Sequence, residues 1–135
     1  MVQRNPSESS EHEGLIRMMA RHFQNQGFTD IRADLAGFVQ PDVITGGGQS
    51  HRPDLTCRRN GVGGAQVILE AETASTIFDD HTASQWTLFS RAARQRGGEF
   101  HVAVPKLING RSGRDVAKDR ARQLGITLDQ VWTPS

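Results

Sequence analysis

The stretch "RPDLTCRRNGVGGAQVILEAET", residues 52–73, decides the fold. Two runs of strand-forming residues, 54–59 and 65–72, flank the turn-rich segment "NGVGG", and this pattern predicts an antiparallel hairpin. Because the second run is the more apolar, we expect it to be the central strand of a sheet. Three acidic residues lie in this hairpin, and buried carboxylates need a cation or hydrogen-bond donors to replace lost water.

Upstream of the hairpin, the sequence predicts one helix and one strand. Residues 1–10 are polar and Ser-rich and are interpreted as a flexible tail, followed by a single domain over residues 11–135. Ser10 and Glu13 have the spacing of a capping box, and the apolar residues after them repeat on one helical face until Gly27. "TDIRADLAGF" alternates like a half-buried strand. The segment "VQPDVITGGGQSHRP" predicts a flexible loop.

Downstream of the hairpin, helices and strands alternate. We expect a helix that begins at Asp79 or Asp80 and continues through about Arg96, followed by a strand in "EFHVAV". A last helix is capped by Ser112 and ends at Gly125, before a strand around "TLDQVW". The order αβββαβαβ predicts an α/β fold, with a mixed β-sheet flanked by helices and at least one parallel crossover.

Length and composition limit the class of protein. A chain of 135 residues suits one compact domain, and its single cysteine, Cys57, cannot form an internal disulfide. The N-terminus lacks the pattern of a signal peptide, and the apolar runs are far shorter than the roughly 20 residues that cross a bilayer. We therefore expect a cytoplasmic protein without a membrane partner.

The net charge of +1 conceals an uneven distribution along the chain. Residues 1–85 contain seven Lys/Arg and eleven Asp/Glu, whereas residues 86–135 contain nine and four. The small total argues against a strongly basic, non-specific nucleic-acid coat. The second part nevertheless carries enough positive charge to face phosphates, unless its arginines serve only to keep amphipathic helices soluble.

The acids of the hairpin are expected to converge. Residues two apart on a strand point the same way, so Glu70 and Glu72 share one face. Pairing of the two strands places Asp54 near the end of the strand that carries them. Three carboxylates with only oxygen ligands favour a hard cation, Mg²⁺ or Mn²⁺. The alternative is that the acids are structural and pair with arginines such as Arg52 or Arg58.

The spacing of these acids resembles that of a known family. A Pro-Asp at 53–54, a gap of 15 residues and Glu-Ala-Glu at 70–72 are similar to the signature of the PD-(D/E)xK nuclease superfamily. The order of elements also resembles the core of that superfamily, which includes many restriction endonucleases and the archaeal Holliday junction resolvases. The resemblance covers roughly residues 13–106. It implies a restriction endonuclease-like fold and metal-dependent cleavage of nucleic acid.

Carried over to this chain, the resemblance makes Asp54 and Glu70 metal ligands. Glu72 occupies the position at which the superfamily usually has a Lys that orients the attacking water, and we expect Glu72 to join the metal site. Some active restriction enzymes of the superfamily also have Glu there. Several members place a Gln on the helix after the acidic strand, and Gln85 matches it, although a structural buried amide is the alternative.

Three further residues are candidates beside this set. Lys106 follows the next strand, where open α/β sheets build their sites, so it could supply the positive charge missing at position 72. Glu13 matches a metal-linked Glu on the first helix of the archaeal resolvases, but its spacing from Ser10 also explains it as a cap. Asp42 follows a second Pro and competes with Asp54, which we favour.

The sequence therefore predicts a Mg²⁺- or Mn²⁺-dependent nuclease with Asp54, Glu70, Glu72 and Gln85 in its site. Because the chain has no Tyr and few aromatic residues, duplex or branched DNA is favoured over single strands as the substrate. A homodimer is left open. One alternative is a non-catalytic domain of the same fold that binds nucleic acid or a partner protein. Another is a small α/β regulatory module without metal.

Overall fold

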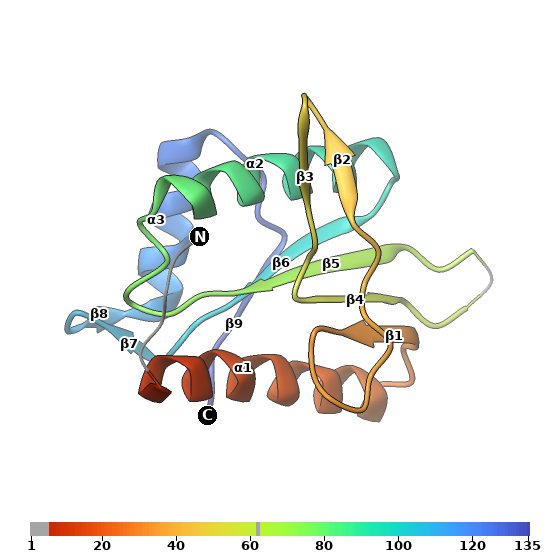
Figure 1. Ribbon diagram of the computed structural model, residues 1–135, viewed down its shortest axis with the longest axis horizontal. Coiled ribbons are helices and arrows are strands. Elements are labelled where there is room, and N and C mark those ends of the chain that lie inside the picture. Colours follow the sequence, from red (N-terminus) through yellow and green to blue (C-terminus); the bar gives the residue numbers. More distant parts are fainter. Residues whose placement is uncertain (1–5, 62) are drawn as a thin grey trace.

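The computed structural model describes residues 6–61 and 63–135 and has a mixed α/β architecture (Figure 1). Its main sheet has five strands in the order β1-β4-β5-β6-β9, and β2-β3 and β7-β8 form two small hairpins. The elements are α1 (Pro6–Asn25), β1 (Thr29–Ala33), β2 (Ile44–Gly46), β3 (Gln49–His51), β4 (Leu55–Arg58), β5 (Gln66–Ala71), α2 (Asp80–Gln95), β6 (Glu99–Ala103), β7 (Leu107–Ile108), β8 (Arg111–Ser112), α3 (Gly113–Leu124) and β9 (Gln130–Trp132).

Strand β5 lies at the centre of the main sheet, as its apolar run predicts. It pairs antiparallel with β4, where Leu55 lies opposite Leu69, and parallel with β6, where Glu70 lies opposite Val102. Helix α2 forms the crossover between β5 and β6. Strand β9 adds a second parallel pair to β6. The predicted hairpin and the predicted parallel crossover are both confirmed.

The helices cover the two faces of the sheet (Figure 1). Val67, Leu69 and Ala71 of β5 belong to a buried cluster with the apolar residues of α1. Ile68 belongs to the cluster on the other face, with the buried residues of α2 and α3. Since side chains alternate along a strand, Glu70 continues the face of Ile68 and lies under α2 rather than under α1.

The "ITGGGQSH" segment is not the flexible loop that its glycines predict. Thr45 pairs with Ser50 in the β2-β3 hairpin, and their hydroxyl oxygens lie 2.8 Å apart. Gly47 and Gly48 form the turn with φ values of +56° and +78°, a conformation that other residues rarely adopt. The glycines therefore build a tight hairpin turn, and Ile44 of β2 is buried in the cluster beneath α2.

The first helix also begins earlier than the capping-box spacing predicts. It starts at Pro6, so residues 6–10 are helical and Ser10 is not its N-cap. A proline is well tolerated in the first turn, because the amide hydrogen that it lacks would have no partner inside the helix. Residues 1–5, the rest of the predicted flexible tail, lie outside the described residues. No helix among the described residues is long and apolar enough to cross a membrane.

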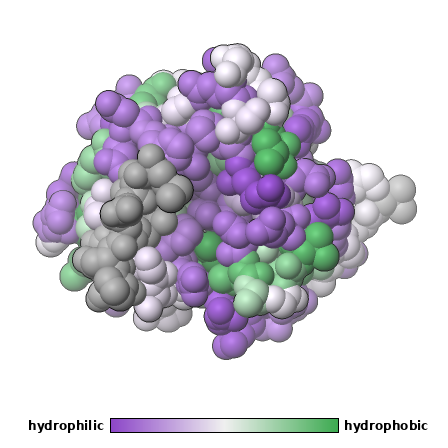
Figure 2. All heavy atoms as spheres, viewed as in Figure 1, coloured by the Kyte–Doolittle hydropathy of each residue, from purple (hydrophilic) through white to green (hydrophobic). Residues whose placement is uncertain are grey.

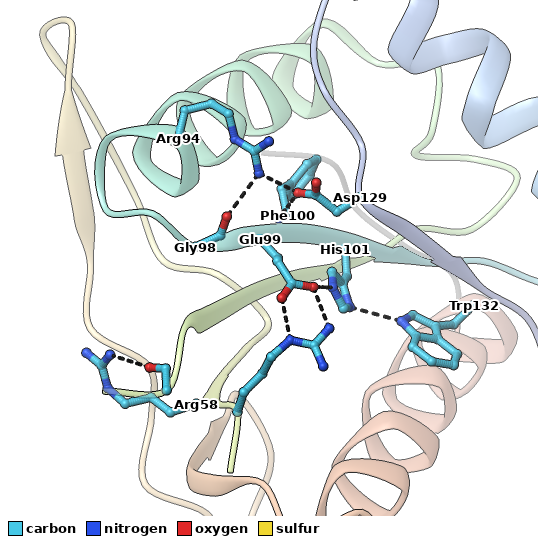
Figure 3. A network of polar contacts seen from close by, with 10 residues as sticks. Arg58, Arg94, Gly98, Glu99, Phe100, His101, Asp129 and Trp132 are labelled. Atoms are coloured by element: carbon cyan, nitrogen blue, oxygen red, sulfur yellow. Dashed lines mark hydrogen bonds and ion pairs between the residues drawn. The ribbon is translucent and has the colours of Figure 1, made fainter. Parts of the chain in front are cut away.

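A polar network links the start of β6 to the end of β9 (Figure 3). Arg59 binds the Glu99 carboxylate with two donors, and this ion pair lowers the pKa of Glu99 to about 2. Nε2 of His101 lies 2.9 Å from Glu99, while its Nδ1 accepts from the indole of Trp132 at 3.1 Å. An indole N–H can only donate, so the neutral His101 ring carries its proton on Nε2. Burial lowers the pKa of His101 and keeps the ring neutral.

Candidate functional site

Asp54 and Glu70 are held together by a reciprocal pair of hydrogen bonds. The backbone N–H of Asp54 donates to Oε2 of Glu70 at 2.9 Å, and the backbone N–H of Ala71 donates to Oδ2 of Asp54 at 2.9 Å. Pairing of β4 with β5 begins at Leu55 and Leu69, so Asp54 comes immediately before β4 and lies beside the end of β5. The hairpin register therefore places both carboxylates at one point.

The Glu70 carboxyl lies in an unfavourable place for a negative charge. Only 2% of the residue is exposed. Burial raises the pKa of Glu70 well above its usual value, and the nearby charges of Asp54 and Glu72 raise it further. Desolvation and like charges both disfavour the ionised form. A cation beside Glu70 would offset this cost of ionisation and would therefore bind strongly.

Glu72 follows directly after β5 and is also 2% exposed. Its Oε1 accepts from the Thr76 hydroxyl at 2.8 Å, and its Oε2 accepts from the Trp86 indole N–H at 3.0 Å. Burial and the charge of Asp54 raise the pKa of Glu72 to about 7, although both donors act in the opposite direction. Two donors aimed at position 72 require an acceptor there, and the ammonium of a Lys could not replace it.

His12 of α1 completes this group, and the sequence analysis missed it. Its Nε2 lies 3.2 Å from Oδ2 of Asp54, across the end of the sheet. The signal was present, because His12 precedes Leu15, Ile16 and Met19 at helical spacing and so belongs to the apolar face of α1. A half-buried histidine on that face holds the Asp54 carboxylate in position.

Asp54, Glu70 and Glu72 line a cleft of about 230 Å³ between α1, α2 and the β3-β4 connection. Gln85 lines this cleft, as predicted, together with His81 and Thr82 of the first turns of α2. Arg52 and Asp34 line its other side. The surface turned toward the viewer in Figure 2 is largely hydrophilic, with only small hydrophobic areas. The cleft thus combines buried acids with polar walls.

The three further candidates do not lie in the cleft. Lys106 is exposed and lines a separate hollow with Glu11 and Pro134. Glu13 is exposed on α1, one residue after His12. Asp42 is 89% exposed at its side chain and pairs with Arg32 at 3.4 Å. Of the two Pro-Asp pairs, only the one that contains Asp54 contributes to the cleft.

The donor set fits a hard divalent cation in part. No three His, Cys, Asp or Glu side chains in residues 6–61 and 63–135 stand close enough together to hold a metal ion by themselves. Asp54 and Glu70 supply carboxylate oxygens at one point, whereas both oxygens of Glu72 are already bound by Thr76 and Trp86. Mg²⁺ commonly binds through one or two carboxylates, with water and substrate phosphate as its other ligands. Asp54 and Glu70 fit that mode.

Comparison with known proteins identifies no relative: no family model, no curated protein and no solved structure matches this chain.

Trp86→Phe tests the contact between the indole and Glu72. Because the folded pKa of Glu72 is raised to about 7, its stabilising contribution is complete below the unfolded value near 4.5 and is lost as the pH rises through 7. Removing a donor that favours the ionised form raises this pKa further. We expect the variant to lose about 2 kcal/mol of unfolding free energy near pH 8, and clearly less near pH 5.5.

Trp132→Phe is the matched control, because it removes the same indole from a bond to neutral His101. Its cost should change much less than that of Trp86→Phe across the same pH range, because no acid accepts from this indole. Denaturant unfolding at both pH values measures the two costs. An equal loss for Trp86→Phe at both values would show that the indole does not act on the Glu72 charge.

Proposed function

We propose that this protein is a metal-dependent phosphodiesterase that cleaves nucleic acid, with duplex or branched DNA as its substrate. The observation that carries the proposal is the reciprocal pairing of Asp54 with Glu70, at the end of a central strand and inside a polar cleft. The acid-bearing hairpin, followed by a helical crossover to a parallel strand, supports the finer assignment to a restriction endonuclease-like core.

In this proposal, Asp54 and Glu70 would hold Mg²⁺ or Mn²⁺. When bound, the ion would polarise the scissile phosphate and lower the pKa of the attacking water. Asp54 is kept in position by His12 and by the N–H of Ala71. Arg52, at the side of the cleft, provides a charge that attracts the phosphate.

Glu72 accepts a proton from the attacking water. A carboxylate has about four lone-pair sites, and Thr76 and Trp86 occupy one on each oxygen, so acceptor sites remain. Its two donors fix the orientation of the carboxylate beside the cleft, and Gln85 can bind the water or the phosphate from α2. This division of roles gives Glu72 the place of the usual Lys without making it a third metal ligand.

The proposal is tested by incubating the protein with linear, nicked and four-way DNA, each with Mg²⁺ or Mn²⁺, and by recording thermal unfolding with and without the ion. We expect cleavage of at least one substrate and a rise in Tm, because a ligand that binds only the folded state stabilises it. A rise in Tm without any cleavage favours the non-catalytic nucleic-acid-binding alternative. No rise and no cleavage contradict the proposal.

A further inference from the structure

A second polar groove lies beside the main sheet. It has a volume of about 260 Å³ and lies between the β1-β4 edge of the sheet, the start of β2 and the end of α2. Its polar and charged lining residues are Asp30, Arg32, Asp42, Thr56, Arg58, Gln66 and Arg96. None of these residues lines the acidic cleft.

The groove and the acidic cleft share one face of the sheet. Leu55 and Cys57 of β4 point into the cluster beneath α1. Thr56 and Arg58 therefore point to the other face, which also carries Glu70. Pairing extends this face sideways, because Thr56 lies opposite Arg32 on β1. Ile44 of β2 and the buried side chains of α2 cover the middle of this face, so the cleft and the groove open at its two ends. A duplex that contacts both sites passes outside β2 and α2.

The arginines of the groove differ in their partners, and the two that pair with no carboxylate in the described part of the chain lie at the end farther from Asp54 and Glu70. Arg32 pairs with two carboxylates, those of Asp30 and Asp42, at 3.0 and 3.4 Å. By contrast, Arg58 and Arg96 donate their hydrogen bonds, among the described residues, to uncharged oxygens. Arg58 donates to the carbonyl of Gly64 at 3.5 Å, and Arg96 donates to the side chain of Gln66 at 3.0 Å.

Gln66 brings these two arginines together. It is the β5 partner of Arg58 in the hairpin register and also accepts the hydrogen bond of Arg96. Two guanidinium groups from different elements, neither of them paired with a carboxylate of the described residues, therefore flank one polar side chain at the end of a groove. Guanidinium groups bind phosphate oxygens well, because their planar donors match the geometry of the anion.

We propose that Arg58 and Arg96 bind a backbone phosphate of the nucleic acid whose scissile phosphate lies in the acidic cleft. The inference rests on the proposed function for the identity of this anion. Arg58 is four residues from Asp54, which along a strand is about 13 Å. A duplex rises about 3.4 Å per nucleotide along its axis, so the contacted phosphate lies within about four nucleotides of the cleavage point.

The test is binding of a fluorescein-labelled DNA duplex by anisotropy at several salt concentrations, without added divalent metal so that no cleavage occurs. Arg58→Gln/Arg96→Gln is compared with Arg17→Gln/Arg21→Gln, which removes the same charge from exposed positions of α1, the helix on the opposite face. For each lost phosphate contact, we expect affinity to fall roughly tenfold near 0.1 M salt and the slope of log K against log salt to decrease by about 0.9. The α1 pair should change much less.

Both double variants must unfold at the temperature of the wild type; if the groove pair does not, the single change Arg96→Gln, outside every strand, replaces it. Equal losses of affinity for the two pairs overturn the proposed phosphate contact in the groove. A wild-type protein that binds no duplex overturns it as well. Cleavage by the wild type together with unchanged binding by Arg58→Gln/Arg96→Gln overturns the groove alone. Arginine-dependent binding by a wild type that does not cleave supports the groove and counts against the proposed phosphodiesterase.

Discussion

Glu70→Gln is expected to abolish metal-dependent cleavage and, in the same protein, to raise stability in the absence of metal. The amide oxygen of Gln still accepts the hydrogen bond from the Asp54 N–H, so the hairpin keeps its register. The variant also lacks the buried carboxyl group, and with it the negative charge that burial and Asp54 disfavour by raising the pKa of Glu70. We expect the cleavage rate to fall by at least about 10³-fold, since the ion contributes several kcal/mol to the transition state.

The expected gain in stability is about 1 kcal/mol or more near pH 8, in the range of changes that relieve a strained functional site. Glu13→Gln provides the control, because it makes the same chemical change at an exposed position of α1 outside the cleft. It should alter neither quantity. Denaturant unfolding and a cleavage time course measure both effects, and a Glu70→Gln protein that cleaves normally would show that the acid is structural.

Glu72→Gln is expected to remove most of the cleavage activity while leaving the fold intact. Gln can accept from the Trp86 N–H through its oxygen and donate to the Thr76 hydroxyl, so both contacts have a substitute. What it loses is the ability to take a proton. Loss of a positioned general base lowers rates by about 10²- to 10⁴-fold, and the assay is the same time course.

Glu72→Lys separates the role of this residue from that of the usual Lys. Its ammonium would face the N–H of Trp86, and a donor that faces a donor in a buried site costs about 1–3 kcal/mol. We therefore expect Glu72→Lys to be less stable than Glu72→Gln and also inactive. A stable, active Lys variant would instead mean that the position tolerates the usual residue and that the indole contact is dispensable.

The parts of the fold that the sequence predicted are those with strong periodicity or local turn chemistry. The apolar run before Glu70 and the turn before it predicted a central strand and its antiparallel partner, because both signals lie within about twenty residues. The β2-β3 hairpin was missed because Gly47 and Gly48 are equally typical of a loop and of a hairpin turn. The two-residue strands β7 and β8 are too short to show any alternation.

The candidate site was predicted only as far as local spacing reaches. Asp54 and Glu70 belong to one hairpin, so their pairing follows from its register. The contact of Glu72 with Trp86 depends on how α2 packs on the sheet, and no pattern in the sequence encodes that position. His12 approaches Asp54 from a helix 42 residues away in the chain, and its apolar-face spacing indicates burial but not a partner.

The two tryptophans also determine what light can report about this protein. The chain has no Tyr and only Trp86 and Trp132, so its near-ultraviolet emission comes from two indoles in different surroundings. One donates to a carboxylate in the acidic cleft, and the other donates to a neutral imidazole on the opposite face of the sheet, among the residues packed against α1. In Trp132→Phe, all indole emission therefore originates beside Glu72, and we expect occupation of the cleft to change it without a label.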